Sequence, residues 1–281
     1  MNVLLLGSEG TLGKSLYNYL IKNGIRVIKW DIKIDSSHDL RNKNCIDSIL
    51  KQTDFVIFLA FDVGGSKYNV NSKDFIDNNM QIIINTFDSL YKNNKPFIYS
   101  TSCMSNMITN PYGSLKNISE HYVNILGGIN VKLWNVYGNE EICEKSHVIP
   151  DFIDSANKNK CINMKTQGDD ERQFIHCDDF SEAIFLIMSK YNLFSNYIKD
   201  NSNKTIDISS YKWFTILDLA KIIKDIYKKE YNIDINITTS CGKDNHTNKT
   251  EPSVSLLNDY WTPQLSLYEG IKDIIKRNIH I

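Results

Sequence analysis

Tyr112 and Lys116 lie four residues apart in a segment, 112–126, that begins after Pro111, ends at Gly127 and has a helical pattern. This spacing puts both side chains on one face of the helix. A lysine cation stabilises a nearby phenolate, so we expect Lys116 to lower the pKa of Tyr112. The preceding strand, 97–99, ends in hydroxyl groups, and either Thr101 or Ser102 can share a substrate oxygen with Tyr112. These groups can transfer a proton while an alcohol is oxidised or a ketone reduced beside a nicotinamide, whose ribose Lys116 can also bind.

The opening segment, 1–31, supplies the elements that would hold that nicotinamide. An apolar strand at 3–6 is followed by a glycine-rich turn, a helix that ends near Gly24, and a second apolar strand at 25–30. The three glycines permit a sharp turn, close approach to a pyrophosphate, and packing of helix on strand. Asp31 can accept both hydroxyls of an adenosine ribose and would repel a 2′-phosphate, which favours NAD over NADP. The predicted cofactor contacts here are Gly7, Gly10, Thr11, Leu12, Gly13 and Asp31.

The next elements complete the first half of a doubly wound sheet: a short helix at 46–51, a strand at 55–60, a helix at 74–93 and the strand at 97–99. Five further residues are candidates for cofactor binding. Asp39 and Leu40 can hold an adenine edge, although Asp39 suits a surface turn equally well, and Asn79 can either brace the sheet or contact the cofactor. Leu59 and Ala60 lie at the carboxyl edge of the sheet, where such folds bind ligands. The inward residues of the long helix are predicted to be Phe75, Met80, Ile83, Ile84, Phe87 and Leu90.

Composition restricts the class of protein. The chain has 281 residues and a formal charge of −1, which gives no reason to expect nucleic acid or a charged membrane surface as partner. No apolar run reaches the length of a membrane span, and we expect no signal peptide. The six cysteines are scattered and form no Cys-x-x-Cys pair. This pattern suits a reducing compartment and argues against a zinc site, so we expect a cytoplasmic protein without a metal.

Further motifs follow the Tyr112 helix. They are Asn135-Val136-Tyr137-Gly138, the segment from Arg172 to Asp179, Trp261-x-Pro263 and the segment 267–271. Together with the glycine pattern and the Tyr/Lys pair they resemble, nearly end to end, the extended short-chain dehydrogenase/reductase family of nucleotide-sugar epimerases, dehydratases and reductases. The resemblance implies that Arg172 binds the substrate diphosphate, for which a planar guanidinium is well suited. It also implies substrate contacts at Asn135 and Val148, and a homodimer formed through the helices at 74–93 and 112–126.

One branch of the family fits better than others. Gly64-Gly65, Cys103 and the segment 146–150 resemble the GDP-fucose synthases, and the first two also resemble the GDP-mannose 3,5-epimerases. In the synthases a cysteine and a histidine act as acid and base on carbons beside a 4-keto group, which implies these roles for Cys103 and His147. The alternatives are that Cys103 is a small buried hydrophobe and His147 a loop residue. This alignment makes Thr101 the catalytic hydroxyl, whereas an ungapped alignment of the strand selects Ser102.

The chain also departs from the family. Met104-Ser105-Asn106 replaces the usual Tyr-Gly or Tyr-Pro, and the stretch from Cys103 to Tyr112 is short, which trims the expected pocket. GDP-fucose synthases prefer NADPH, whereas Asp31 favours NAD. Ser102-Cys103 occupies the place of the Asp-Glu pair of the dehydratases, which argues against a 4,6-dehydratase.

The predicted fold is α/β: a Rossmann doubly wound parallel sheet with a smaller C-terminal α/β substrate-binding lobe. Residues 1–140, joined by about 176–205 with a helix at 178–190, are expected to form the NAD-binding domain. Residues 141–175 and 206–281 are expected to form the nucleotide-sugar-binding lobe. Its predicted elements are helices at 148–157, 214–228 and 267–277, strands at 161–164, 206–208 and 233–237, and a mobile loop at 238–250.

The predicted function is epimerisation, or epimerisation with reduction, of a 4-keto sugar nucleotide with NAD(H). A simple 4-epimerase of the UDP-glucose/galactose type with tightly bound NAD is an alternative, and it needs Tyr112 and Lys116 but neither Cys103 nor His147. An alternative of another class is a catalytically inactive protein that senses NAD. The sequence identifies neither the nucleotide nor the sugar.

Overall fold

A six-stranded parallel sheet forms the centre of the computed structural model, which describes residues 1–64, 70–138, 140–143, 146–201, 204–242 and 250–278. The strand order is β10-β5-β4-β3-β1-β2, so the chain winds outward from the centre in both directions, as the sequence predicts. The strands are β1 (Asn2–Leu6), β2 (Arg26–Trp30), β3 (Phe55–Phe58), β4 (Phe97–Ser102), β5 (Ile129–Leu133) and β10 (Thr205–Ile208).

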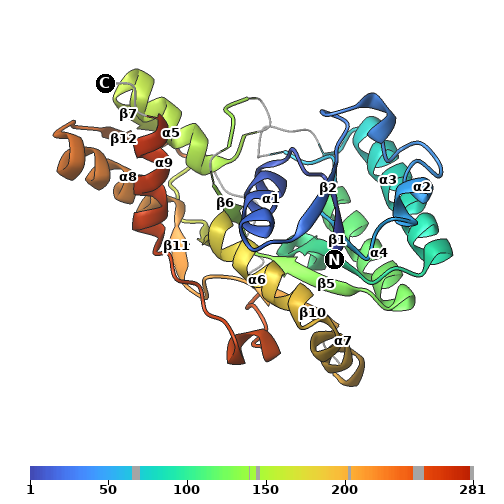
Figure 1. Ribbon diagram of the computed structural model, residues 1–281. Coiled ribbons are helices and arrows are strands. Elements are labelled where there is room, and N and C mark those ends of the chain that lie inside the picture. Colours follow the sequence, from blue (N-terminus) through green and yellow to red (C-terminus); the bar gives the residue numbers. More distant parts are fainter. Residues whose placement is uncertain (65–69, 139, 144–145, 202–203, 243–249, 279–281) are drawn as a thin grey trace.

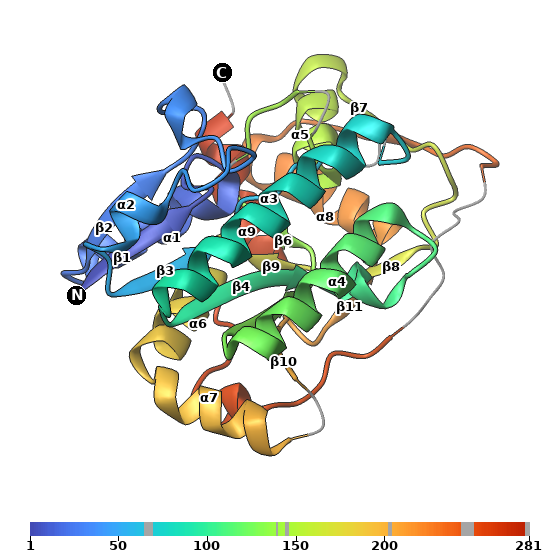
Figure 2. The same cartoon turned by 90° about the vertical axis from the view of Figure 1, so that its right-hand side faces the viewer.

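Helices cover both faces of this sheet (Figures 1 and 2). One face packs against α1 (Thr11–Lys22), α6 (Cys177–Ser189) and α7 (Tyr191–Asp200), and the other against α2 (Asp47–Leu50), α3 (Lys73–Asn93) and α4 (Pro111–Leu126). Side chains alternate between the two faces: Val3 and Leu5 of β1 join the first core, while Leu4 and Leu6 join the second. Both faces of β1 are therefore buried, which explains its continuous apolar run.

Local sequence signals place α4 against the end of β4. The Asn110 side chain accepts hydrogen bonds from the backbone N–H groups of Tyr112 and Gly113, and Pro111 occupies the first turn. The helix ends at Gly127, whose φ of 74° is left-handed. This start puts Tyr112 and Lys116 in the first two turns of α4.

A second hydrophobic core lies in the C-terminal half, around α5 (Val148–Asn159), α8 (Ile216–Tyr231) and α9 (Leu267–Asn278). Three small two-stranded sheets accompany it: β7 (Cys161–Asn163) with β12 (Asn236–Thr238), β8 (Glu171–Gln173) with β11 (Trp213–Thr215), and β6 (Val136–Tyr137) with β9 (Ile175–His176). Short 3₁₀ helices span Ser36–His38, Cys103–Asn106 and Leu256–Asp259.

The structure corrects the sequence predictions in three places. Residues 206–208 were expected in the C-terminal lobe, but they pair with β5 and form the edge strand of the main sheet. This pairing gives them backbone hydrogen bonds to the sheet and buries Ile206 and Ile208 in the core of that sheet. Ile84, expected to face inward, is exposed on α3. Helix α7 was not expected, because its ten residues are mostly polar and only Phe194 and Ile198 provide a buried apolar pair. Of the loop predicted at 238–250, residues 243–249 lie outside the described part of the chain.

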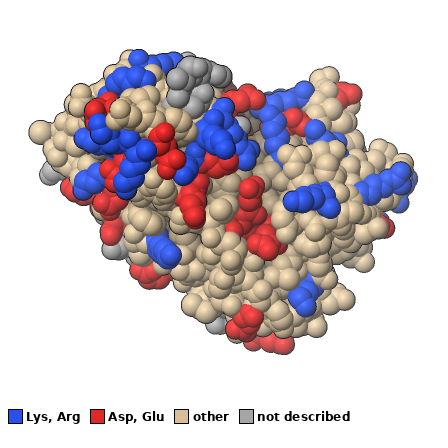
Figure 3. Space-filling view, turned by 60° about the vertical axis from the view of Figure 1, so that its left-hand side comes forward, with Lys and Arg blue, Asp and Glu red and all other residues tan. Residues whose placement is uncertain are grey.

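Within the described segments, no helix combines the length and apolar character that a membrane crossing requires. On the face shown in Figure 3, basic and acidic side chains are interspersed rather than gathered into a patch of one sign.

Candidate active site

The last two side chains of β4 point in different directions. The Ser102 hydroxyl accepts the backbone N–H of Met104 at 3.2 Å, and its proximity to the Tyr112 phenol lowers the pKa of Tyr112 in part. Thr101 Oγ1 instead donates to Glu120 Oε1 at 2.6 Å. Because successive side chains of a strand face opposite sides, Thr101 lies on the face of β4 that Tyr99 presents toward α4. Both hydroxyls therefore lie near the first turns of α4, Thr101 through Glu120 and Ser102 through its effect on Tyr112.

Lys116 is buried beside Tyr112, with 3% of its surface exposed. Its Nζ donates to the Ser100 carbonyl at 2.8 Å and lies 4.0 Å from the centre of the Phe61 ring and 4.8 Å from that of Tyr99. Burial lowers the pKa of Lys116 to about 7, and the Glu120 carboxylate acts in the opposite direction. Near neutral pH this side chain is therefore close to its own protonation midpoint.

The Tyr112 hydroxyl is a proton donor in this environment. Burial raises the pKa of Tyr112 to about 12, and the nearby Ser102 hydroxyl offsets only part of that rise. The prediction that Lys116 gives the phenol a lowered pKa is wrong in its net direction, because Lys116 Nζ lies 5.9 Å from the ring centre and desolvation dominates. At neutral pH the phenol keeps its proton.

Cys103 and Arg172 line one pocket of about 120 Å³. Burial raises the pKa of the Cys103 thiol, and the Arg172 guanidinium acts against this rise, so Cys103 holds its proton at neutral pH. Two tryptophans of the lining contact each other edge to face, with ring centres 6.1 Å apart. The other lining residues, these tryptophans included, are mostly apolar or uncharged. They are Met104, Asn106, Met107, Trp134, Asn135, Glu171, Trp213 and Thr250.

Arg172 is held in place on β8, which pairs antiparallel with β11. Its Nη2 forms an ion pair with Asp170 at 2.7 Å, and its Nη1 donates to the Glu171 carbonyl at 2.8 Å. Asn135 has a left-handed φ of 38° and donates to the Gln173 carbonyl at 3.3 Å. The Arg172 guanidinium is therefore held on a braced strand at the pocket, where Asp170 is its ion-pair partner.

His147 is not among the residues that line this pocket in the described part of the chain. It precedes Val148, the first residue of α5, and 55% of its side chain is exposed. Its Nδ1 lies 2.9 Å from Glu140 Oε1, and this hydrogen bond raises the pKa of His147. The structure thus brings Cys103 to Arg172 but does not bring His147 to them.

The glycine-rich turn fits the pyrophosphate of a dinucleotide. Gly7 has a φ of 84°, and a Cβ on it would lie 2.7 Å from the Ala60 nitrogen. A Cβ on Gly13 would lie 2.2 Å from the Gly7 carbonyl oxygen. Helix α1 begins at Thr11, and its N-cap residue is Gly10, which has no side chain to bind the first N–H groups of the helix. These N–H groups therefore face the turn and are available to an anion. This close packing of Gly7 also places Leu59 and Ala60 against the turn.

The acidic residues at the expected adenosine end have different surroundings. Asp31 follows β2 and accepts the backbone N–H groups of Glu9 and Lys33, both at 2.9 Å. This position beside the glycine turn agrees with a ribose-binding carboxylate. Asp39 is paired with Arg41, whose Nη2 lies 2.7 Å from Asp39 Oδ2.

Leu40 and Asn79 have structural partners. Leu40 is 6% exposed and belongs to the core under α3. The amide of Asn79 accepts the Asp62 N–H at 2.8 Å and donates to the carbonyls of Asp62 and Phe75, both at 3.0 Å. These bonds favour the bracing interpretation of Asn79, which holds the loop after β3.

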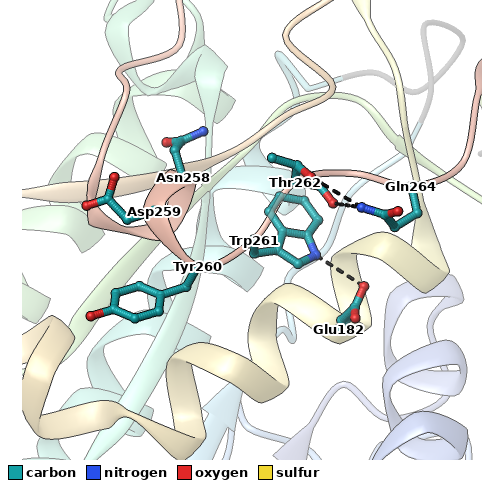
Figure 4. A pocket seen from close by; sticks show the side chains of 7 residues that line it. All are labelled: Glu182, Asn258, Asp259, Tyr260, Trp261, Thr262 and Gln264. Carbon is teal, nitrogen blue, oxygen red and sulfur yellow. Dashed lines mark hydrogen bonds between the residues drawn. The ribbon is translucent and has the colours of Figure 1, made fainter.

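The closing motif packs on α6, away from the reacting cluster. Asp179 accepts the N–H groups of Gln264 and Leu265 at 3.0 and 3.1 Å, and Trp261 donates to Glu182 at 3.2 Å. A hollow of about 320 Å³ lies here (Figure 4), and neither Tyr112 nor Lys116 is among its described lining residues. The pocket of Cys103 and Arg172 is the one that adjoins the cluster in the chain, since Cys103 directly follows Ser102.

Sequence reasoning missed three residues around the cluster. Glu120 lies eight residues after Tyr112, and this helical spacing was a usable signal. Phe61, which covers Lys116, directly follows the predicted contacts Leu59 and Ala60 but has no polar group that would mark it as a site residue. Trp213 lines the pocket from β11, and no pattern in the sequence pointed to it.

Comparisons with known proteins identify the family and the fold. The model of the NAD dependent epimerase/dehydratase family matches residues 3–198. A putative GDP-L-fucose synthase 2 of Arabidopsis thaliana is 24% identical over 308 residues, covering 96% of this chain and 89% of its own.

Two solved structures share the fold. A GDP-6-OMe-4-keto-L-xylo-heptose reductase from C. jejuni has a TM-score of 0.84 at 20% identity, covering 98% of this chain and 97% of the other. A UDP-glucose 4-epimerase from Thermotoga maritima has a TM-score of 0.80 at 18% identity and covers 98% of both chains.

Proposed function

Because the chain belongs to the NAD dependent epimerase/dehydratase family, we propose that it epimerises, or epimerises and reduces, a 4-keto sugar nucleotide with NAD(H). One observation carries the proposal: Tyr112 lies beside buried Lys116 with Ser102 close by, and Cys103, the next residue, lines the pocket of Arg172. The similarity to GDP-L-fucose synthases over nearly the whole chain supports the same class of substrate.

The dinucleotide would be held by the glycine turn at its pyrophosphate and by Asp31 at its adenosine ribose. When bound, the nicotinamide supplies or accepts a hydride. We favour NAD because both Asp31 oxygens already order the turn, and a 2′-phosphate would meet that carboxylate. Lys116 is the residue that would bind the nicotinamide ribose.

Tyr112 would donate its proton to the ketone oxygen, and Ser102 would hydrogen-bond the same oxygen. The raised pKa of Tyr112 keeps this proton available at neutral pH, which suits reduction of a ketone. Arg172 would bind the diphosphate and so fix the sugar at the Cys103 end of the pocket. Asn135 and Val148 are further proposed substrate contacts.

Cys103 and His147 are the proposed acid and base for inversion beside the ketone. The raised pKa of Cys103 suits a group that returns a proton to carbon. Glu140 holds Nδ1 of His147, which leaves Nε2 as the atom that exchanges a proton.

A simple 4-epimerase is the second candidate, and one observation favours it. His147 does not line the described pocket, and a 4-epimerase needs Ser102, Tyr112 and Lys116 but no such histidine.

We also propose a homodimer through α3 and α4. These helices expose apolar side chains that a soluble monomer rarely gathers on adjacent elements. They are Ile76, Ile84, Tyr91, Ile118, Tyr122 and Ile125. Size-exclusion chromatography with light scattering tests this, and an Ile84→Glu variant should be monomeric.

The deciding experiment incubates the protein with NADH or NADPH and with GDP- or dTDP-linked 4-keto-6-deoxy sugars in deuterated water, followed by NMR. Loss of NADH with deuterium at carbon 3 or 5 supports the epimerase-reductase, and deuterium without loss of NADH supports an epimerase. Cys103→Ala should abolish exchange, whereas Cys143→Ala, at an exposed cysteine, should not. Inversion of UDP-glucose at carbon 4, without reaction of the keto sugars, would establish the 4-epimerase instead.

A further inference from the structure

Glu120 is a partly buried acid that the reaction described above does not use. It lies on α4 one helical repeat beyond Lys116, which itself lies one repeat beyond Tyr112, so the three side chains share a face of the helix. The Glu120 side chain is 13% exposed. An acid at this depth requires partners, because burial of an unpaired carboxylate is strongly unfavourable.

Two side chains from the sheet hold the Glu120 carboxylate. Thr101 Oγ1 of β4 donates to Glu120 Oε1 at 2.6 Å, and Lys132 Nζ of β5 lies 3.6 Å from the same oxygen. The backbone is fixed as well, since Asn130 Nδ2 donates to the Glu120 carbonyl at 3.1 Å. The carboxylate therefore cannot rotate away from the helix face that carries Lys116.

A row of polar residues continues this network across the sheet. Thr101, Lys132 and Asp207 are register neighbours on β4, β5 and β10. Asp207 accepts hydrogen bonds from Trp134 Nε1 at 3.3 Å and from the Ser253 N–H at 2.6 Å. Trp134 lines the pocket, so the network reaches from α4 to the wall of the substrate site.

The network contains one more negative charge than positive charges. Glu120, which is partly buried, and Asp207, which is buried, supply two carboxylates, while Lys132 supplies one ammonium group. Lys116 in its ammonium form balances the sum. Of the charged groups that act on Lys116, Glu120 is the one whose field favours the protonated form, and burial opposes it.

We propose that Glu120 is a positioning residue of the reacting cluster: clamped by Thr101 and Lys132 on the helix face of Lys116, its carboxylate favours the ammonium form of Lys116 beside Tyr112. This inference rests on the proposed function for its catalytic consequence. In that reaction the ammonium group binds the nicotinamide ribose and lies beside the proton donor, so turnover falls when Lys116 loses its proton.

The other groups around Lys116 do not replace this charge. Tyr112 on α4 and Tyr99 on β4 face it as neutral phenols, both with a raised pKa. Phe61, in the loop after β3, contributes an uncharged ring. Asp62, next to Phe61, is bound by Asn78 Nδ2 at 3.3 Å on the α3 side of that loop. Glu120 is thus the acid whose removal should shift the titration of Lys116.

The test compares the pH profiles of kcat for Glu120→Gln, Glu120→Asp and Thr101→Val. In Glu120→Gln the alkaline limb should move to lower pH by about one unit, because the amide keeps an acceptor for Thr101 but has no charge. Glu120→Asp keeps the charge and should lie closer to wild type. Thr101→Val removes the clamp hydrogen bond but not the charge, so its limb should stay within about 0.3 unit of wild type. Equal shifts in Glu120→Gln and Thr101→Val, or no shift in Glu120→Gln, would overturn the proposal.

A measurement without substrate separates this inference from the proposed function. Urea midpoints at pH 6 to 9 are compared for wild type, Lys116→Met, Glu120→Gln and the double variant. In each background, the difference in urea midpoint between the protein with Lys116 and its Lys116→Met variant reports the titration of Lys116. This titration should occur at lower pH when Glu120 is replaced by Gln. If turnover is never found but this shift is, the proposed function fails and the charge coupling stands. If the two backgrounds titrate alike, the coupling fails.

Discussion

Because Lys116 is buried, we expect the free energy of unfolding to rise with pH. Lys116→Met should abolish this rise. The pKa of Lys116 falls from its ordinary value of 10.5 to about 7 in the folded chain. Between these two values the unfolded chain binds the proton and the folded chain does not. The contribution of Lys116 to stability is therefore fully present above the unfolded-state pKa and is lost as pH falls through 7.

The size of this effect follows from the two pKa values. Between pH 6 and pH 9 the proton linkage of Lys116 changes the free energy of unfolding by about 3 kcal/mol, with stability higher at pH 9. Lys116→Met has no such proton to lose. Its stability relative to wild type should therefore be greatest at pH 6 and should fall by about 3 kcal/mol by pH 9.

Urea unfolding at four pH values, followed by tryptophan fluorescence, measures this difference. Lys22→Met, at an exposed position on α1, is the matched control and should run parallel to wild type. A difference between wild type and Lys116→Met that changes by less than about 0.5 kcal/mol over this range would refute the burial of a desolvated lysine.

Three other substitutions test separate parts of the site. Ser102→Ala should lower kcat by about 10²-fold or more, whereas Thr101→Val should lower it far less, and equal losses would contradict the placement of Ser102 beside Tyr112. Asp31→Asn should weaken NADH binding and bring the affinities for NADH and NADPH closer together, as nucleotide fluorescence titration would show; an unchanged ratio would exclude Asp31 as the discriminating residue. Gly13→Ala should destabilise the fold by about 1–3 kcal/mol in thermal unfolding, because its Cβ would overlap the Gly7 carbonyl, and a neutral outcome would contradict the tight turn.

Periodicity and glycine placement were sufficient to predict the Rossmann half of the fold. The apolar run of β1, the turn from Gly7 to Gly13 and the cap at Gly127 are local signals, and each element occurs where its own residues specify it. The edge strand β10 could not be placed in this way. Its residues, 205–208, have a strand pattern that would fit either lobe. Only the pairing with β5 decides which sheet they join.

The candidate site was predictable to the extent that helix spacing fixes direction. Tyr112 and Lys116 share a face of α4 because they are four residues apart. The choice between Thr101 and Ser102 depends on the register of β4 against α4, which the sequence does not contain. The rise in the pKa of Tyr112 likewise depends on burial, which outweighs the nearby cation.

The most direct test of the account is Tyr112→Phe compared with wild type, in NADH binding and in turnover of the 4-keto sugar nucleotides. The account predicts that Tyr112→Phe binds NADH within about threefold of wild type, since the phenol contributes a proton rather than a binding charge, and that turnover falls by about 10²-fold or more. Turnover close to that of wild type would show that Tyr112 is not the proton donor. Binding without turnover in both proteins would identify a dinucleotide sensor rather than an enzyme.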